Sequence, residues 1–292
     1  MVNKLKSESI IKKVAAIHDM SGFGRASLTT IIPVLATMGI QTCPIPTAIL
    51  STHSGGFSGY TFNDLTDLMP AYVNHWKELD LHFNCIYSGF LGSAKQINIV
   101  IDIIDTFKTK DNLTVVDPVL GDDGSLYSSI SKDMVPEMRR LISKADIITP
   151  NITEAQLLLD TYDYPSLENG KKWLKALSSI GPRITMITSF PENQITMSTL
   201  AYDKEKDEYW KVPSKLLPYS YPGTGDLFTS VLIGNILNGE SIPIAAATAS
   251  AFVYKCIDIS SKFDYPKRDG VLLEQMLPEL RKPNMDLLYE KI

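Results

Sequence analysis

The feature that most constrains the fold of this chain is an alternation of two kinds of segment. Short apolar runs rich in β-branched residues are separated by longer segments in which apolar residues recur with helical spacing. Strands that alternate with helices of this length build βαβ units and a mainly parallel sheet, so we predict an α/β fold. The predicted strands are 14–17, 45–50, 85–87, 113–116, 146–148 and 184–187, and the predicted helices are 27–38, 97–107, 134–142 and 169–177.

The pattern changes after residue 187. The stretch MSTLAYDKEKDEYWKV has two strand-like arms around a charged turn, Asp203 to Asp207, and predicts a β-hairpin. Two apolar helices are predicted after it, at 226–237 and 244–256. We find no internal repeat, low-complexity tract or linker in the 292 residues, and we predict a single domain, 1–292.

Charge and cysteine content exclude several classes of protein. A net charge of -5 without a basic stripe argues against nucleic-acid binding. No run of about 18 apolar residues predicts a membrane-spanning helix, and the basic first 20 residues lack the apolar stretch of a cleavable leader. Cys43, Cys85 and Cys256 form no CxxC pair, which argues against disulfides or a zinc site and predicts a reducing, cytoplasmic location.

The most informative motif is Gly223-Thr224-Gly225-Asp226, which leads directly into an apolar helix. Two glycines let the backbone approach a ligand closely, and the free N–H groups of a helix start favour an anion such as a phosphoryl group. An aspartate placed there can accept a proton from an attacking hydroxyl. A tight turn in which Asp226 only complements the helix dipole would give the same pattern.

Two further segments follow predicted strands. Asn151 and Glu154 have the spacing of a helix-capping box, and they could also hold a hydrated Mg²⁺ with its phosphates. Asp117 ends a buried strand, where a carboxylate needs a partner, while Asp122 belongs to a turn-like Asp-Asp-Gly sequence. Both segments therefore leave a structural and a functional interpretation open.

The segment after the first strand, His18 to Gly24, superficially resembles a dinucleotide-binding fingerprint. Ser27 stands where the third glycine belongs, so we reject NAD binding and interpret the loop as a substrate-facing lip. A second polar segment contains His53 and Ser54, although a lone histidine is more often structural than catalytic. No GxSxG, HExxH or GxxxxGK[ST] motif occurs, which argues against an α/β-hydrolase, a zincin and a P-loop kinase.

These motifs occur in an order that resembles the pyridoxal kinases of the ribokinase-like superfamily over nearly the whole chain. Singly each motif is weak, but five in order at predicted strand ends or helix starts make a strong signal. The matching segments are SGFLGS (88–93), DPVLGDDGSLY (117–127), ADIITPNITEAQLL (145–158), ITS (187–189) and GTGDLF (223–228).

The resemblance implies a central sheet flanked by helices on both faces, ATP as phosphoryl donor, Mg²⁺ with a monovalent cation (K⁺ or Na⁺), and a homodimer. It implies that Asp226 is the general base and that Gly223 to Gly225 form the anion hole. The remaining assignments are Asn151, Glu154, Thr188, Ser189 and Asp117 to the nucleotide, Asp117, Asp122 and Glu154 to the metal, and Asp19, Ser21, His53, Ser54, Phe90 and Tyr127 to the substrate, a B6 vitamer.

The chain departs from the pyridoxal kinase pattern at the substrate lip. Asp19 stands where human-type pyridoxal kinases carry a serine, and residues 19–22 look more like the loop of hydroxymethylpyrimidine kinases of thiamine biosynthesis. Those enzymes, however, usually carry a cysteine where this chain has Asp226. A hydroxymethylpyrimidine kinase and a catalytically silent vitamin-binding regulator are therefore the two alternatives.

Overall fold

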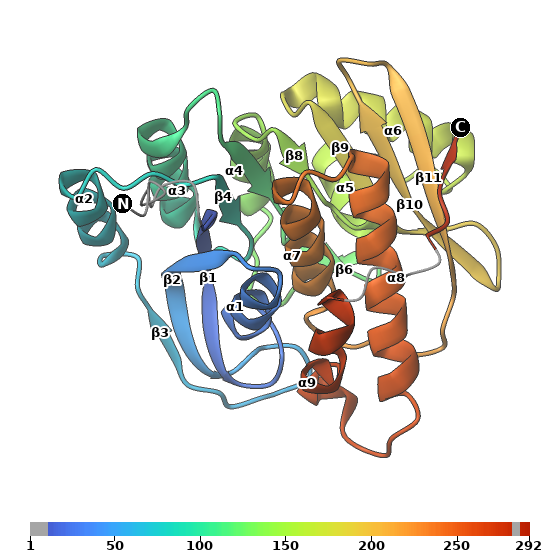
Figure 1. Cartoon of the computed structure of the whole chain (residues 1–292), viewed down its shortest axis with the longest axis horizontal. Coiled ribbons are helices and arrows are strands. Elements are labelled where there is room, and N and C mark those ends of the chain that lie inside the picture. Colours follow the sequence, from blue (N-terminus) through green and yellow to red (C-terminus); the bar gives the residue numbers. More distant parts are fainter. Residues whose placement is uncertain (1–10, 282–286) are drawn as a thin grey trace, which may run out of the picture.

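A computed structural model describes residues 11–281 and 287–292 as one ten-stranded sheet with helices packed on it (Figure 1). The strand order is β12-β11-β10-β9-β8-β5-β4-β1-β2-β3, and β6 and β7 form a separate two-stranded sheet. The strands are β1 (Lys13–Phe23), β2 (Gln41–Thr52), β3 (Phe62–Asp64), β4 (Cys85–Ser88), β5 (Leu113–Val116), β6 (Gly121–Asp122), β7 (Ser125–Leu126), β8 (Ile147–Ile148), β9 (Ile184–Pro191), β10 (Thr196–Asp203), β11 (Glu208–Lys215) and β12 (Glu290–Lys291). The helices are α1 (Leu28–Thr37), α2 (Met69–Glu78), α3 (Ala94–Phe107), α4 (Met134–Ile142), α5 (Ile152–Leu159), α6 (Leu167–Ile180), α7 (Thr224–Leu237), α8 (Ile242–Ser260) and α9 (Leu273–Met276), with 3₁₀ turns at Lys267–Asp269 and Leu277–Arg281.

The predicted parallel sheet is confirmed. Strands β2, β1, β4, β5, β8 and β9 pair in parallel, while β3 and the strands from β10 onward pair antiparallel. The hairpin predicted around Asp203 to Asp207 is β10 and β11. Because the parallel strands all point the same way, their carboxyl ends meet along one edge, where ligands bind in such folds.

Alternating side chains of the strands fill two hydrophobic layers. Val14 and Ala16 of β1 face one layer, and Ala15 and Ile17 face the other, as the two-residue period of a strand requires. Helices α1, α7 and α8 close the first layer, and α2 to α6 close the second (Figure 1). Helices therefore flank both faces, and burial on both sides explains why the central strands read as continuous apolar runs.

Helix α8 is the one described helix that is long and apolar enough to cross a membrane by length and composition. Its buried residues include Ala245, Phe252 and Cys256, which pack in the layer shared with α7 and the sheet. A core helix has the same composition, so the absence of a membrane span stays a prediction. The prediction that the first 20 residues contain no cleavable leader falls partly on residues 1–10, which lie outside the described part of the chain.

Candidate active site

A cavity of about 880 Å³ opens at the carboxyl ends of the parallel strands. Loops from distant parts of the sequence meet there, including those after β1, β5, β8 and β9 and the start of α7. Of the residues assigned from sequence, only Ser21 does not line the cavity. Those that do are Asp19, His53, Ser54, Phe90, Asp117, Asp122, Tyr127, Asn151, Glu154, Thr188, Ser189, Gly223, Thr224, Gly225 and Asp226.

The start of α7 has the geometry of an anion site. Gly223 is the N-cap and adopts φ 80°, a left-handed conformation that glycine adopts without strain. A Cβ atom at this position would lie 2.1 Å from the carbonyl oxygen of Arg25, so the loop before α1 presses directly on the turn. The glycine has no side chain to cover the first amides of α7, which can therefore face the cavity. At this end of the helix, the dipole favours negative charge.

Asp226 lies in the first turn of α7, at the bottom of the cavity. Its Oδ2 accepts a hydrogen bond of 2.7 Å from the backbone N–H of Ser27, and its Oδ1 lies 3.7 Å from Nδ1 of His18. The pKa of the Asp226 carboxyl is raised to about 7, chiefly by burial; the hydrogen bond from the Ser27 N–H opposes this shift, and the charge of Asp19 adds to it. A carboxylate with this pKa is a suitable general base near neutral pH, because general bases work best when their pKa is close to the operating pH.

Asn151 and Glu154 form the capping box that their spacing predicts. The Asn151 side chain accepts the N–H of Glu154 at 2.9 Å, and Oε2 of Glu154 accepts the N–H of Asn151 at 2.8 Å. Oε1 of Glu154 also accepts the N–H of Leu120 at 3.1 Å, which ties the loop after β5 to α5. The pair therefore has a structural function, and both residues also line the cavity.

Asp117, at the end of β5, is buried beside other acidic groups. Burial raises its pKa well above the usual value, and the charge of Asp226 adds to this effect. Burial also raises the pKa of Glu154, with Asp117 as the second cause. Burial raises the pKa of Asp122 as well. Carboxylates that destabilise each other's charged forms in this way fit a bound cation, which would stabilise all of them.

No three His, Cys, Asp or Glu side chains within residues 11–281 and 287–292 are already placed around one point as metal ligands. Mg²⁺ usually keeps several waters and binds through one or two carboxylates together with substrate phosphates. The metal role of Asp117, Asp122 and Glu154 stays a prediction.

Thr188 and Ser189, assigned to the nucleotide, follow the buried part of β9. The N–H of Thr188 donates to the carbonyl of Pro150 at 2.9 Å, and this bond holds the second half of β9 beside Asn151. Ser189 has a left-handed backbone with φ 55° and an exposed side chain. Both residues line the cavity on the same side as Asn151, as a nucleotide site built from the ends of β8 and β9 requires.

The substrate lip differs in detail from the sequence interpretation. Asp19 is 4% exposed, and its two carboxylate oxygens accept hydrogen bonds from the hydroxyls of Ser21 and Ser27. Ser21 is fully buried and lies behind Asp19 instead of lining the cavity. Asp19 therefore holds the connection between β1 and α1 through these two hydrogen bonds, and it also lines the cavity.

His53 joins two walls of the cavity. Its Nδ1 accepts the N–H of Gly55 at 3.1 Å, so its Nε2 carries the proton and donates to the carbonyl of Arg268 at 2.7 Å. The guanidinium of Arg268 lies 4.8 Å from the ring centre of Phe57, a cation–π contact that strengthens the same junction. His53 thus holds the loop after β2 against the segment before α9, which explains why this lone histidine is buried.

The segment before α9 was not identified as part of the site from sequence. Lys267 and Arg268 line the cavity from a charged turn that reads as an ordinary surface loop. Tyr60 and Phe62, from the segment that enters β3, and Tyr221, from the loop before α7, also line it. No local sequence pattern connects these residues, because only the tertiary fold brings them together.

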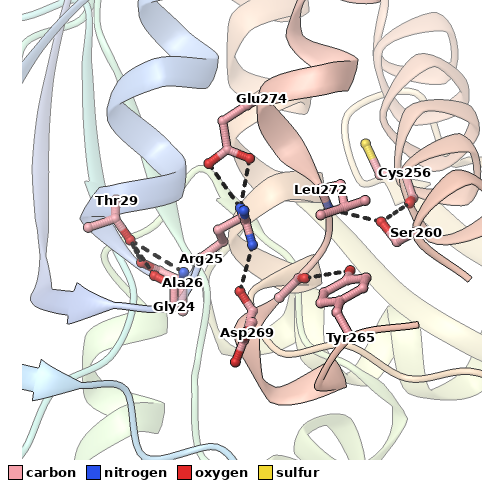
Figure 2. A network of polar contacts seen from close by, with 11 residues as sticks. Gly24, Arg25, Ala26, Thr29, Cys256, Ser260, Tyr265, Asp269, Leu272 and Glu274 are labelled. Carbon is pink, nitrogen blue, oxygen red and sulfur yellow. Dashed lines mark hydrogen bonds and ion pairs between the residues drawn. The ribbon is translucent and has the colours of Figure 1, made fainter. Parts of the chain in front are cut away.

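A polar network holds this segment against the β1–α1 loop (Figure 2). The Nε of Arg25 lies 2.8 Å from the carboxylate of Glu274, and both its backbone N–H and its Nη1 donate to the carbonyl of Asp269 at 3.1 Å. Tyr265 donates to the carbonyl of Gly270 at 2.8 Å, which braces the same turn. Arg25 thus connects the β1–α1 loop, which packs against the turn at Gly223, to the segment around Asp269 and Glu274.

The site as a whole can support phosphoryl transfer to an alcohol. A buried carboxylate with a raised pKa, Asp226, lies at the glycine-lined start of α7, and a second buried carboxyl, Asp117, lines the same cavity. Phosphoryl transfer needs little covalent chemistry from a protein beyond positioning, charge stabilisation and a proton acceptor. The cavity is also large enough for a nucleotide and a small acceptor together.

Comparisons with known proteins agree with this chemistry. A family profile described as phosphomethylpyrimidine kinase matches residues 28–270. The chain is 28% identical over 277 residues to a pyridoxal kinase of Arabidopsis thaliana, covering 88% of this chain and 87% of that protein. A pyridoxal kinase structure from Lactobacillus plantarum has a TM-score of 0.84 at 29% identity and covers 92% of this chain and 96% of that one.

A stronger similarity is to a candidate phosphomethylpyrimidine kinase from Bacteroides thetaiotaomicron. One crystal form has a TM-score of 0.94 at 46% identity and covers 99% of this chain and 100% of that one. A second form, solved with pyridoxal, has a TM-score of 0.93 at the same identity and covers 97% and 100% of the two chains. The chain belongs to the phosphomethylpyrimidine kinase family, among the kinases of ribokinase-like fold that include the pyridoxal kinases.

Proposed function

We propose that this enzyme transfers the γ-phosphoryl group of ATP to the 5′-hydroxymethyl group of pyridoxal, pyridoxine or pyridoxamine. The observation that carries the proposal is Asp226, a buried carboxylate with a pKa of about 7 beside the glycine-lined start of α7. The relatives support the choice of acceptor, since several are named pyridoxal kinase and the Bacteroides protein has a crystal form with pyridoxal.

The residues of the chain divide the reaction between them. Asp226 takes the proton of the hydroxymethyl group while the oxygen of that group forms a bond to the γ-phosphorus. The bond from the γ-phosphorus to the bridging oxygen of ATP breaks, and ADP leaves with the electron pair. The amides at 223–225 face the negative charge that spreads over the transferring group, which is where preorganised donors stabilise a transition state most.

We also propose Mg²⁺ as the resident cation, held by Asp117, Asp122 and Glu154 together with the phosphates. When bound, it neutralises phosphate charge and aligns the transferring group. The three carboxyls fit this function because burial raises the pKa of each, and neighbouring carboxylates add to the effect: Asp226 for Asp117, Asp123 for Asp122, and Asp117 for Glu154. A monovalent cation and a homodimer complete the proposal on the family resemblance, and the cysteine content of the sequence supports a cytoplasmic location.

A hydroxymethylpyrimidine kinase is the second candidate. The description of the matching family and the sequence of residues 19–22 favour it. Asp226 argues against it, because the resemblance associates a cysteine with that position in the pyrimidine kinases. Asp19 is also bound on both oxygens by Ser21 and Ser27, so its presence alone does not define a pyrimidine site.

An ADP-release assay with each acceptor separates these two functions. We expect at least one B6 vitamer to give a kcat/KM about tenfold or more above that of hydroxymethylpyrimidine, equal to about 1.4 kcal/mol in transition-state binding. Omission of each acceptor gives the control for ATP hydrolysis. If hydroxymethylpyrimidine is used as well as or better than every vitamer, the vitamer assignment is wrong.

A further inference from the structure

His18 belongs to the segment interpreted from sequence as the substrate lip, but it was assigned no role of its own, and the structure places it beside Asp226. It is the sixth residue of β1, has 0% exposure, and its Nδ1 lies 3.7 Å from Oδ1 of Asp226. Among the residues that the structure describes, neither of its ring nitrogens has a hydrogen-bond partner. A buried imidazole without a partner is unfavourable for folding, because the lost hydration is not replaced.

The surroundings fix the position of the His18 ring. A Cβ atom on Gly89 would lie 2.0 Å from the ring Cε1 and 2.4 Å from Nδ1, so the ring packs closely against the backbone after β4. The ring of Tyr87 meets it edge-on with centroids 4.3 Å apart. The ring therefore has little room to turn, and its Nδ1 edge stays directed toward Asp226.

The ring is also uncharged. Burial lowers the pKa of His18 to about 3, so the contact with Asp226 is not an ion pair near neutral pH. A neutral imidazole carries one N–H, and a nearby carboxylate favours the tautomer that places this proton on Nδ1. Ser27 holds the other oxygen, Oδ2, through its backbone N–H at 2.7 Å.

We propose that His18 is a positioning residue for Asp226, whose Nδ1–H holds Oδ1 while the Ser27 N–H holds Oδ2. Two donors, one on each oxygen, fix the rotation of the carboxylate and leave its remaining lone pairs free for the substrate hydroxyl. The distance of 3.7 Å is longer than a hydrogen bond, and catalytic hydrogen bonds in unliganded enzymes commonly shorten once substrate binds. This inference rests on the proposed function, in which Asp226 is the base.

Three variants distinguish positioning from packing. His18→Leu keeps an apolar volume without a donor, and we expect it to lower kcat about tenfold to hundredfold with KM for the vitamer changed less than about threefold. In His18→Asn the amide nitrogen falls close to the position of Nδ1, whereas in His18→Gln it falls close to that of Nε2. We expect Asn to restore kcat better than Gln, although Gln is closer to histidine in size.

A double-mutant cycle gives the decisive comparison. In an Asp226→Asn background, His18→Leu should lower the remaining rate by less than about twofold, because the group through which His18 acts has already been removed. A loss as large as in the parent background, or Gln and Asn variants of equal activity, would overturn the proposal. If the parent enzyme phosphorylates no vitamer, the proposed function fails, and the cycle is then measured with the alcohol that it does accept.

A spectroscopic measurement tests the contact without turnover. The chain has four histidines, and loss of one signal set in His18→Asn assigns His18 in ¹⁵N-labelled protein. We expect His18 to be neutral between pH 6 and 8 with its proton on Nδ1. A proton on Nε2 would place the lone pair of Nδ1 against the carboxylate and overturn the proposal, whatever the activities of the variants.

Discussion

Asp226→Asn is expected to lower kcat by about 10²- to 10⁴-fold, the usual contribution of a general base. Asparagine has nearly the same size and can still accept the N–H of Ser27 through its amide oxygen, but it cannot take a proton. The interaction that is lost develops mainly in the transition state, so KM for the vitamer and for ATP should change little. Steady-state ADP release with the preferred vitamer measures both parameters.

Stability provides the control for this variant. Because folding raises the pKa of Asp226 to about 7, the folded state binds this proton more tightly than the unfolded chain does. The group therefore stabilises the fold at low pH, and this contribution is lost as the pH rises toward and through 7. At pH 8, the Asp226→Asn protein should therefore unfold at the same temperature as the parent or at a higher one. The control variant is Asp80→Asn, at an exposed position after α2, which should leave both rate and stability unchanged. A mutant rate within threefold of the parent would reduce Asp226 to a helix-start residue.

Gly223→Ala should damage both the fold and the reaction. At φ 80° an L-residue is strained by about 1–3 kcal/mol, and the new Cβ would lie 2.1 Å from the carbonyl oxygen of Arg25. The turn must then move away from the β1–α1 loop, which displaces the amides of the anion site. We expect the melting temperature to fall and kcat to fall about 10²-fold or more, since loss of one such donor has an effect of this size.

Gly39→Ala is the matched control. Gly39 follows α1 with φ 81°, nearly the same backbone conformation, and no atom lies within 4 Å of its Cβ position. This variant should lose stability through backbone strain but keep the parent kcat. If Gly223→Ala and Gly39→Ala lose equal stability and both keep full activity, the close approach at Gly223 has no function in catalysis. Should Gly223→Ala fail to fold, Gly225→Ala adds a methyl group that meets only Oδ2 of Asp117 at 3.6 Å and tests the same amides.

The central architecture could be predicted because its signals are local. Each buried parallel strand has its own apolar run, and the hairpin at 196–215 has a charged turn between two strand-like arms. Helix α2 was missed because only Met69 and Val73 are buried, so its apolar spacing is weak. Helix α5 has only eight residues, and although its capping box was recognised from the spacing of Asn151 and Glu154, no helix was predicted after it.

Strands β1 and β2 are longer than predicted for a physical reason. Only residues 14–17 of β1 pair with β4, while the rest of β1 continues alongside β2 alone, past the body of the sheet. Polar residues are tolerated in that extension because it borders the cavity. The polar sequence from His18 onward therefore resembled a loop although the backbone is extended.

The prediction of site residues succeeded where one short segment carries both the geometry and the chemistry. Gly223 to Asp226 form a complete anion site and base within four residues. Ser21 and His53 were harder to interpret, since their partners, Asp19 and Arg268, determine whether they face the cavity. His18 gave no signal, because its contact with Asp226 joins residues more than 200 positions apart.

The pH dependence of kcat/KM for the preferred vitamer tests the central claim most directly, namely that Asp226 is the catalytic base of a small-molecule kinase. Because Asp226 must be ionised to accept the hydroxyl proton and its pKa is about 7, the rate should be highest above pH 7 and fall about tenfold per unit below it. The residual activity of Asp226→Asn should lack this acid limb. A parent rate that stays level down to pH 5, or an acid limb that persists in Asp226→Asn, would contradict the account.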